Sequence, residues 1–228
     1  MSLWSNFLIH NGRPAQKWAQ YFPVYERHLA QFTGRSATML EIGVSKGGSL
    51  QMWKRYLGPH AQIVGVDIDP SCKAFEEDQI AVRIGDQSDH GFLQSLVDEF
   101  GAFDAVLDDG SHRSSHMVGT FRFLYPQISP SGVYMVEDLH AAYVARYEGG
   151  YKRAGTFIEF CKDMIDDIHV RYSHKIPPLG YSPITLSMHV YDSIAVFERG
   201  RHSPARSITV GEHPVVGEHP VEVNKADK

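Results

Sequence analysis

The stretch Thr38-Met-Leu-Glu-Ile-Gly-Val-Ser-Lys-Gly-Gly-Ser49 decides the fold of this chain. Its first half, 38–43, is an apolar run with the length of one buried strand. Its second half is rich in glycine and opens a segment, 47–57, with a helical pattern. Glycines at such a turn let the backbone bend sharply and let a ligand approach closely. The stretch therefore predicts a strand–turn–helix unit with a ligand at the turn.

Strand and helix patterns alternate along the rest of the chain. Further strands are predicted at 62–67, 80–84, 103–108, 132–136, 184–190 and 193–198, and helices at 89–100, 114–125 and 152–168. Repeated units of this length favour a parallel sheet with helices on both faces. The last two strands, joined at Tyr191-Asp192, form a predicted hairpin. We therefore predict a Rossmann-like α/β fold with a seven-stranded, mostly parallel sheet and a C-terminal antiparallel hairpin.

The chain divides into three predicted parts. Residues 1–36 carry apolar side chains at helical spacing and form an N-terminal helical cap, followed by the main domain, 37–200. Residues 201–228 contain a repeated Gly-Glu-His-Pro and no amphipathic period, which predicts an irregular tail. The polar, aromatic segment 139–151 is predicted to be a mobile loop. Apolar residues near the N-terminus, such as Trp4, indicate either an oligomer contact or a docked terminus.

The composition excludes several classes of protein. A length of 228 residues with 43% hydrophobic content predicts one domain with a sizeable core. The net charge of −5 provides no basic field for nucleic acid or anionic lipid. Cys72 and Cys161 lie far apart and indicate neither a disulfide framework nor a thiolate zinc site. No signal peptide and no apolar run of about 20 residues is present, so we expect a cytoplasmic protein without a membrane span.

The first glycine-rich turn is the predicted cofactor site. Its candidate binding residues are Glu41, Gly43, Gly47 and Ser49. The spacing E-x-G-x-x-x-G differs from the dinucleotide fingerprint G-x-G-x-x-G and is similar to the turn of methyltransferases that use S-adenosylmethionine. The alternative is an ordinary glycine-rich turn between a strand and a helix.

Polar residues at the ends of the next two strands extend this site. Asp67 can accept hydrogen bonds from both hydroxyls of a ribose, whereas Asp69 is explained as a helix N-cap before Pro70. Asp86, Gln87 and Ser88 follow the third strand, where they can line an adenine pocket. For Ser88, capping of the following helix is an equally good explanation.

Acidic side chains follow two further strands. Asp108-Asp109 ends the fourth strand, and Glu137-Asp138 ends the fifth. Ligands of such sheets bind outside the carboxyl ends of the strands, and neighbouring strands lie about 4.8 Å apart. Several close carboxylates repel one another unless a cation lies between them, and an all-oxygen set favours Mg²⁺, Mn²⁺ or Ca²⁺. The sequence therefore predicts a divalent metal site.

His112 is the candidate catalytic base. It lies three residues after Asp109, on the turn into the next helix, where a neutral imidazole can take a proton from a hydroxyl at the metal. The alternative is a histidine that packs against the start of the helix. His116 and His140 are interpreted as structural or peripheral, although His140 follows the acidic pair closely enough to touch a substrate.

These motifs together resemble the macrocin and mycinamicin type of Mg²⁺-dependent sugar O-methyltransferases, a family of class I S-adenosylmethionine-dependent methyltransferases. The matching segments are 40–44, 47–53, 65–69, 85–89, 108–112, 136–139 and 187–193. The resemblance implies Asp109, Glu137 and Asp138 as metal ligands and His112 as base, and it leaves Asp108 on the cofactor side. It also implies that two neighbouring sugar hydroxyls chelate the metal.

The leading hypothesis is a metal-dependent O-methyltransferase. Its expected cofactors are S-adenosylmethionine and Mg²⁺, its acceptor is a small molecule or glycan, and we expect a homo-oligomer. The alternatives are a NAD-dependent oxidoreductase, against which the glycine spacing argues, and a hydroxylase, whose two-histidine, one-carboxylate site is not supplied by Asp109, His112 and the acidic pair. A non-catalytic binding module of the same fold is the last alternative.

Overall fold

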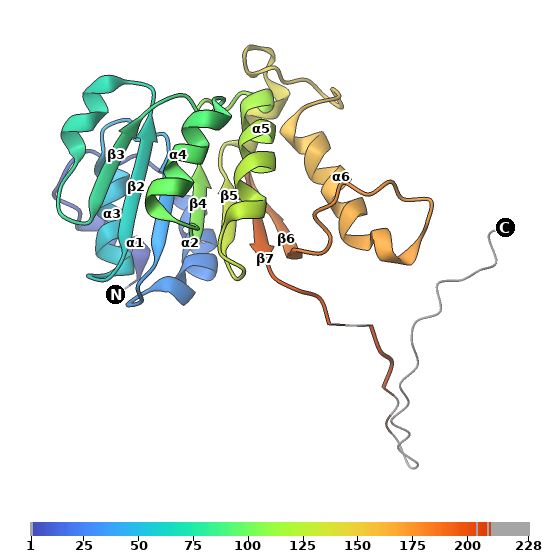
Figure 1. The fold of residues 1–228 in the computed structure, drawn as a ribbon. Coiled ribbons are helices and arrows are strands. Elements are labelled where there is room, and N and C mark those ends of the chain that lie inside the picture. Colours follow the sequence, from blue (N-terminus) through green and yellow to red (C-terminus); the bar gives the residue numbers. More distant parts are fainter. Residues whose placement is uncertain (1, 204, 209, 211–228) are drawn as a thin grey trace.

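Within the described residues, seven strands form one sheet at the centre of the protein (Figure 1). The computed structural model describes residues 2–203, 205–208 and 210. The strands are β1 Thr38–Ile42, β2 Gln62–Asp67, β3 Ile80–Ile84, β4 Ala105–Asp108, β5 Val133–Val136, β6 Thr185–Tyr191 and β7 Ile194–Arg199. Their order is β3-β2-β1-β4-β5-β7-β6, and only β7 runs antiparallel to its neighbours β5 and β6. The predicted sheet and its C-terminal hairpin are confirmed.

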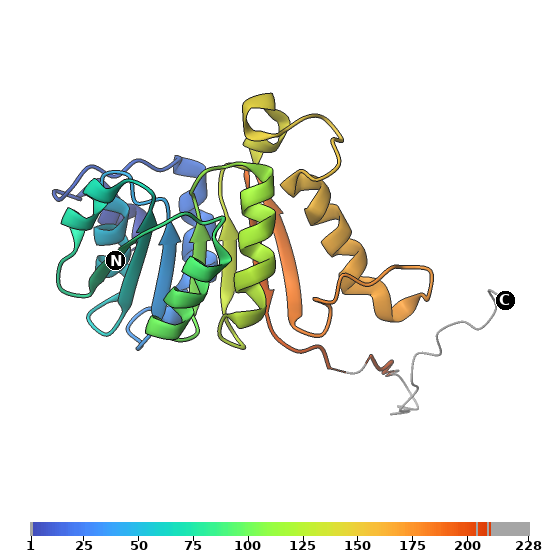
Figure 2. The same cartoon turned by 45° about the horizontal axis from the view of Figure 1, so that its top comes forward.

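Helices cover both faces of this sheet, as the sequence predicts (Figures 1 and 2). One layer contains α1 Leu3–Leu8, α2 Phe22–Leu29 and α3 Gly48–Leu57, and the other contains α4 His90–Phe100, α5 Ser114–Leu124 and α6 Phe157–His169. Side chains alternate between the faces of a strand. Met39 of β1 therefore packs with the first layer, and its neighbour Leu40 packs with the second.

The N-terminal segment docks on the first layer. Leu3 is fully buried, whereas Trp4 and Leu8 remain exposed. The buried Leu3 belongs to the same apolar cluster as Trp53 of α3. Docking of the terminus thus accounts for part of its apolar character.

Three local expectations are corrected by the structure. The hairpin turn is Asp192-Ser193, one residue later than predicted, because β6 extends through Tyr191. The last long helix begins at Phe157 and not at residue 152, since Thr156 caps it by accepting a hydrogen bond from the Glu159 amide. The segment 139–151, predicted as a loop, contains two short 3-10 helices, η5 Leu139–Tyr143 and η6 Ala145–Tyr147.

Other short 3-10 helices connect the main elements. They are η1 Ala19–Tyr21, η2 Ala30–Phe32, η3 Pro70–Phe75, η4 Tyr125–Gln127 and η7 Val170–Tyr172. In the part of the chain that the structure describes, every helix is too short or too polar to cross a bilayer. The predicted irregular tail, 201–228, lies for the most part outside the described residues, as do both copies of Gly-Glu-His-Pro.

Candidate cofactor and metal site

The carboxyl ends of β1, β4 and β5 lie side by side and in register. The Asp109 amide donates to the Ile42 carbonyl at 2.9 Å, and the Glu137 amide donates to the Asp108 carbonyl at 3.0 Å. Gly43, Asp109 and Glu137 therefore leave the sheet next to one another. These adjacent strand ends are the place where the sequence predicts the ligand site.

Gly43 occupies a position that admits no side chain. Its φ of +98° lies in the left-handed region, and a Cβ built on it would lie 2.1 Å from the Asp109 carbonyl oxygen. Any larger residue must push the tip of β1 away from the tip of β4. The glycine thus lets the first strand turn directly beside the acidic strand ends.

Replacing Gly43 by alanine is expected to lower the free energy of unfolding by about 2–4 kcal/mol, from backbone strain and overpacking together. Gly34→Ala is the matched control, because Gly34 has a φ of +72° with open space around its Cβ position, which costs about 1 kcal/mol. Urea unfolding of both variants measures the difference. If both variants lose the same free energy of unfolding, the clash between the added Cβ and the Asp109 carbonyl does not affect stability.

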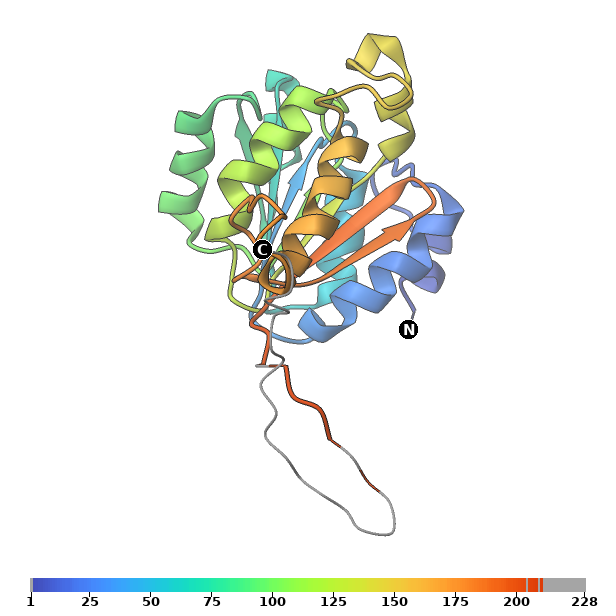
Figure 3. The same ribbon diagram turned by 90° about the vertical axis from the view of Figure 1, so that its right-hand side faces the viewer.

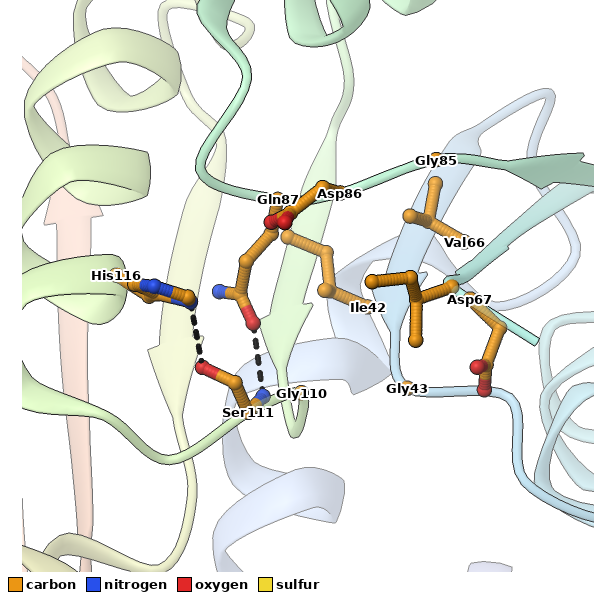
Figure 4. Close-up of a pocket in the computed structure, with 11 residues that line it drawn as sticks. Ile42, Gly43, Val66, Asp67, Gly85, Asp86, Gln87, Gly110, Ser111 and His116 are labelled. Carbon is orange, nitrogen blue, oxygen red and sulfur yellow. Dashed lines mark hydrogen bonds between the residues drawn. The ribbon is translucent and has the colours of Figure 1, made fainter. Parts of the chain in front are cut away.

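A cavity opens beyond the ends of β1, β2 and β3 (Figure 4). Ile42 and Val66 give it apolar walls, and Asp86 and Gln87 stand at its polar side. His116 also lines it, with its Nδ1 atom 3.0 Å from the Ser111 hydroxyl oxygen. An apolar slot with a few polar groups at one side has the character of a site for a planar heterocycle.

Asp86 is held ionised at the edge of this cavity. The backbone N–H and hydroxyl of Ser88 both donate to its Oδ1 atom at 2.8 Å and lower the pKa of the Asp86 carboxyl. The hydroxyl of Ser88 is thereby engaged with Asp86. The cap of α4 is Asp89, which accepts from the amides of Gly91 and Phe92.

Gln87 and Asp108 form a buried network behind the cavity. The Gln87 amide nitrogen donates to both carboxylate oxygens of Asp108 at 3.1 and 3.2 Å, and its amide oxygen accepts from the Ser111 backbone at 2.8 Å. Burial raises the pKa of Asp108 to about 6. Asp108, predicted on the cofactor side, contacts protein partners and does not line the described cavity.

Asp67 fixes the glycine-rich turn. Its Oδ2 atom accepts from the Val44 and Ser45 amides at 2.9 and 3.0 Å, and its Oδ1 atom accepts from the Asp69 amide. Asp69 itself caps η3 by accepting from the Ser71 amide. Asp67 also lines the cavity, so it remains in reach of a ligand while it shapes the loop.

Glu41 and Ser49 lie beneath the turn. The Ser49 hydroxyl donates to the Glu41 carboxylate at 2.7 Å, and both side chains are buried. Burial raises the pKa of Glu41, and the Lys17 ammonium at 3.3 Å opposes that shift. A Cβ on Gly47 would lie 2.8 Å from the Phe75 ring, so Gly47 permits packing of η3 against the turn.

A second, acidic cavity adjoins the first, because Gly43, Asp67 and Gly110 line both. Donor atoms of Asp109, His112 and Asp138 lie within 4.8 Å of one another there. The predicted ligand Glu137 lines the same cavity but is not in this group, and its two carboxylate oxygens accept from Tyr25 and Lys17.

Lys17 places a cation among these acids. Its ammonium lies 2.6 Å from Asp109, 3.1 Å from Glu137 and 3.3 Å from Glu41, and its side chain is 3% exposed. Burial works against the charge, but the three carboxylates outweigh burial and raise the pKa of Lys17. Burial raises the pKa of Glu137, and the positive charge of Lys17 opposes this rise. The acidic group thus already holds one positive charge.

Two tyrosines at the start of α2 donate hydrogen bonds to the acidic pair, Glu137 and Asp138. The Tyr21 hydroxyl donates to Asp138 at 2.8 Å, and the buried Tyr25 hydroxyl donates to Glu137. Together with Lys17, these residues connect the N-terminal segment to the predicted metal ligands.

His112 and Asp138 both have a left-handed backbone, with a φ of 56°. Strained residues of this kind cluster at functional sites. The His112 Nε2 atom lies 3.7 Å from Asp138 and 4.0 Å from Asp109, and its ring packs edge-on against Tyr147 at 5.9 Å. The strained turn therefore directs the imidazole toward the acids.

Several residues that the sequence did not assign to the site come from the N-terminal segment. Lys17, Trp18 and Tyr21 line the acidic cavity, and Tyr25 reaches Glu137 from behind. The apolar spacing in this segment predicted a helix but gave no signal for contacts across more than a hundred residues. His116, interpreted as structural or peripheral, lines the first cavity.

Comparison with known proteins gives several relatives that methylate sugar hydroxyls. No protein-family model matches the chain. The 8-demethyl-8-(2-methoxy-alpha-L-rhamnosyl)-tetracenomycin-C 3'-O-methyltransferase of Streptomyces olivaceus is 37% identical over 199 residues, which cover 82% of this chain and 50% of that protein. The mycinamicin VI 2''-O-methyltransferase of Micromonospora griseorubida is 34% identical over 197 residues, covering 80% of this chain and 48% of that protein.

A solved structure shares the fold. The MycE methyltransferase of the mycinamycin biosynthetic pathway, in complex with Mg, SAH and mycinamycin VI, matches with a TM-score of 0.80 and 31% identity, covering 88% of this chain and 54% of that one. The predicted class I methyltransferase fold is confirmed by this match. The chain spans about half the length of the relatives it matches.

Proposed function

Because this chain is a homologue of the macrocin- and mycinamicin-type sugar O-methyltransferases, we propose that it methylates a hydroxyl of a sugar. The acceptor is a glycosylated natural product, a polysaccharide or a glycolipid. S-Adenosylmethionine is the methyl donor, and a divalent metal, Mg²⁺ or else Mn²⁺ or Ca²⁺, is the second cofactor. The observation that carries the proposal is the acidic cavity at the strand ends, which adjoins the apolar one.

The apolar cavity is the proposed site for the adenosine part of the donor. Its walls suit the purine, and the ionised Asp86 can accept from an exocyclic amine. Asp67 is placed for the ribose, and the turn from Gly43 to Ser49 for the methionine part. Gln87 lines the cavity beside Asp86. Ser88, Asp108 and Glu41 act behind these residues, because their side chains bond to protein partners.

The donor set fits a hard divalent cation. Asp109, Glu137 and Asp138 offer only oxygen atoms, which Mg²⁺ prefers. The Lys17 ammonium now contacts oxygens of Asp109 and Glu137, which a bound ion would share with it or take over. A metal bound by these three residues lowers the pKa of a hydroxyl that it contacts. Tyr21 and Tyr25 fix the carboxylates of Asp138 and Glu137 by donating to one oxygen of each.

His112 is the proposed base. Its Nε2 atom faces the Asp109 and Asp138 carboxylates, so a hydroxyl held there lies within reach of the imidazole. His112 accepts the proton, and the acceptor oxygen forms a bond to the methyl carbon while the carbon–sulfur bond breaks. The sulfur keeps the electron pair of that bond.

Trp18 is the proposed platform for the acceptor sugar. It lines the acidic cavity, is 42% exposed, and stacks on His140 with ring centroids 4.9 Å apart. Trp18→Ala is expected to raise the KM for the acceptor roughly tenfold, equivalent to about 1.4 kcal/mol of binding, with less effect on kcat.

Steady-state kinetics of two tryptophan variants test this role. Trp4→Ala is the matched control, since Trp4 is 39% exposed but packs on Phe22 of α2. An unchanged KM in Trp18→Ala, or an equal rise of KM in Trp4→Ala, would contradict the proposal that Trp18 binds the acceptor sugar.

A screen for methyl transfer tests the function itself. The chain is incubated with S-adenosylmethionine and a panel of glycosides, with Mg²⁺ or with EDTA. We expect transfer to a glycoside that carries two neighbouring hydroxyls, and no transfer in EDTA. Transfer that persists in EDTA would overturn the metal part of the proposal, and binding of NAD in place of S-adenosylmethionine would overturn the reaction class.

We also place the protein in the cytoplasm as a homo-oligomer. Cys72 and Cys161 are buried and unbridged, as in a reducing compartment, and Leu8 and Ile9 are exposed on the N-terminal layer. Light scattering after gel filtration tests the oligomer, and cell fractionation tests the location.

A further inference from the structure

A cluster of polar side chains joins α2 to the β6–β7 hairpin, away from the acidic cavity. Figure 3 shows α2 beside this hairpin. Glu198 of β7 pairs with Val133, the first residue of β5, whereas the acidic pair follows Val136, its last residue. Glu198 thus lies about 13 Å from the acidic pair along the strand direction, and His189, opposite Val196, lies nearer to it.

Residues of one strand face build this cluster. Ser187, His189 and Tyr191 alternate along β6 and therefore project to the same side. Glu198 pairs with Ser187 across the hairpin and projects to that side as well. His28 of α2 covers the group and is only 1% exposed.

The contacts centre on the Glu198 carboxylate. One oxygen lies 2.9 Å from the His28 Nδ1 atom, and the other lies 3.4 Å from the His189 Nε2 atom. The His28 Nε2 atom lies 2.9 Å from the Tyr191 hydroxyl, and the Ser187 hydroxyl donates to Glu198 at 2.5 Å. Both imidazoles thus approach one carboxylate from two sides.

His28 and Glu198 are in the protonation states that bind metal ions. Burial lowers the pKa of His28 despite its contact with Glu198, so the imidazole is neutral. Burial works against ionisation of Glu198, but hydrogen bonds from Ser187, His28 and His189 outweigh it and lower the pKa of this carboxyl. Neutral imidazole and carboxylate are the forms that bind metal ions.

We propose that His28, His189 and Glu198 form a second metal site, specific for a transition metal of the zinc class. One donor atom from each residue lies within 4.8 Å of the others, and donors around a tetrahedral zinc are roughly 3.3 Å apart. Small side-chain rotations therefore bring all three to one ion. Two nitrogens and one oxygen favour zinc over Mg²⁺, so this site differs in chemistry from the acidic cavity.

The neighbouring side chains support the ligands. A metal-bound histidine donates its other ring N–H to a polar partner, and Tyr191 is in place for this at His28. Ser187 orients the Glu198 carboxylate. An ion there links α2 to the hairpin and steadies Tyr21 and Tyr25, which lie just before and within α2 and contact the acidic pair.

Calorimetric titration of the full chain with Zn²⁺ tests the site. The protein is first freed of metal and then kept in excess Mg²⁺, which, if the proposed function holds, competes with Zn²⁺ for the acidic cavity. We expect one Zn²⁺ per chain, and the same in the double variant Asp109→Asn, Asp138→Asn. His189→Gln is expected to lose at least roughly a hundredfold in affinity. Tight binding that is unchanged in His189→Gln, or lost in the double variant alone, would overturn the proposal.

Cobalt provides a test that requires no substitution. Co²⁺ in a four-coordinate nitrogen and oxygen site absorbs visible light strongly, whereas six-coordinate Co²⁺ among oxygens absorbs weakly. We expect the strong bands in the wild-type protein, resistant to Mg²⁺ and abolished by one equivalent of Zn²⁺. Weak bands that Mg²⁺ removes would place the ion in the acidic cavity and contradict the site.

Discussion

His112→Gln is expected to lower kcat by about 10²–10⁴-fold, the usual contribution of a positioned base, with little change in the affinity for the donor. The imidazole lies 3.7 Å from Asp138 and 4.0 Å from Asp109. It lines the acidic cavity and is not among the residues that line the apolar one. Glutamine keeps the size and polarity of the side chain but cannot accept a proton at neutral pH.

Single-turnover rates and titration with S-adenosylhomocysteine measure the two quantities separately. His60→Gln, an exposed histidine outside both cavities, controls for the general effect of the substitution. A loss of donor affinity as large as the loss of rate would show that His112 shapes the cavity and is not the base.

Lys17→Met is expected to lower the free energy of unfolding by about 3–5 kcal/mol in EDTA, the usual result of removing one partner from a buried ion group. Asp109, Glu137 and Glu41 lose their counter-charge together. Because a divalent ion at Asp109 and Glu137 replaces part of that charge, saturating Mg²⁺ should reduce the deficit.

Urea unfolding with and without Mg²⁺ measures this coupling. The matched control is Lys54→Met, whose partner is Glu77 and whose ion pair is partly exposed, so that its expected cost is about 0–1 kcal/mol. Equal losses in the two variants would mean that Lys17 does not stabilise the acidic group. If Mg²⁺ does not reduce the loss of unfolding free energy in Lys17→Met, the charge of Lys17 is not coupled to metal binding at the acids.

The sheet and the acidic strand ends were predictable because their signals are local. An apolar run followed by Gly43 marks one strand end, and Asp109 and Glu137 follow two further strands at fixed positions. In a parallel sheet, neighbouring strand ends must meet at one edge. Pattern and topology together therefore placed these residues side by side without knowledge of any contact.

The partners of those residues were not predictable for the opposite reason. Tyr25 and Tyr21 looked like apolar residues of a helix, and they are buried as such, but their hydroxyls reach Glu137 and Asp138. Lys17 precedes them without any motif. The residue pattern alone allowed either Asp108 or Asp109 to face a metal, and the family resemblance implied Asp109. The structure shows Asp108 bonded to Gln87.

The contacts of the N-terminal segment also set an order of assembly. Lys17 meets a partner 120 residues later, and the Tyr21 hydroxyl contacts residues 117 and 172 positions further on. Contacts between residues so distant in sequence form late, because the intervening chain must first be ordered. During synthesis, Tyr21 has to wait for the hairpin to emerge from the ribosome. The acidic cavity is therefore among the last parts of the molecule to form, although Lys17 and Tyr21, which complete it, are synthesised before the strands that they contact.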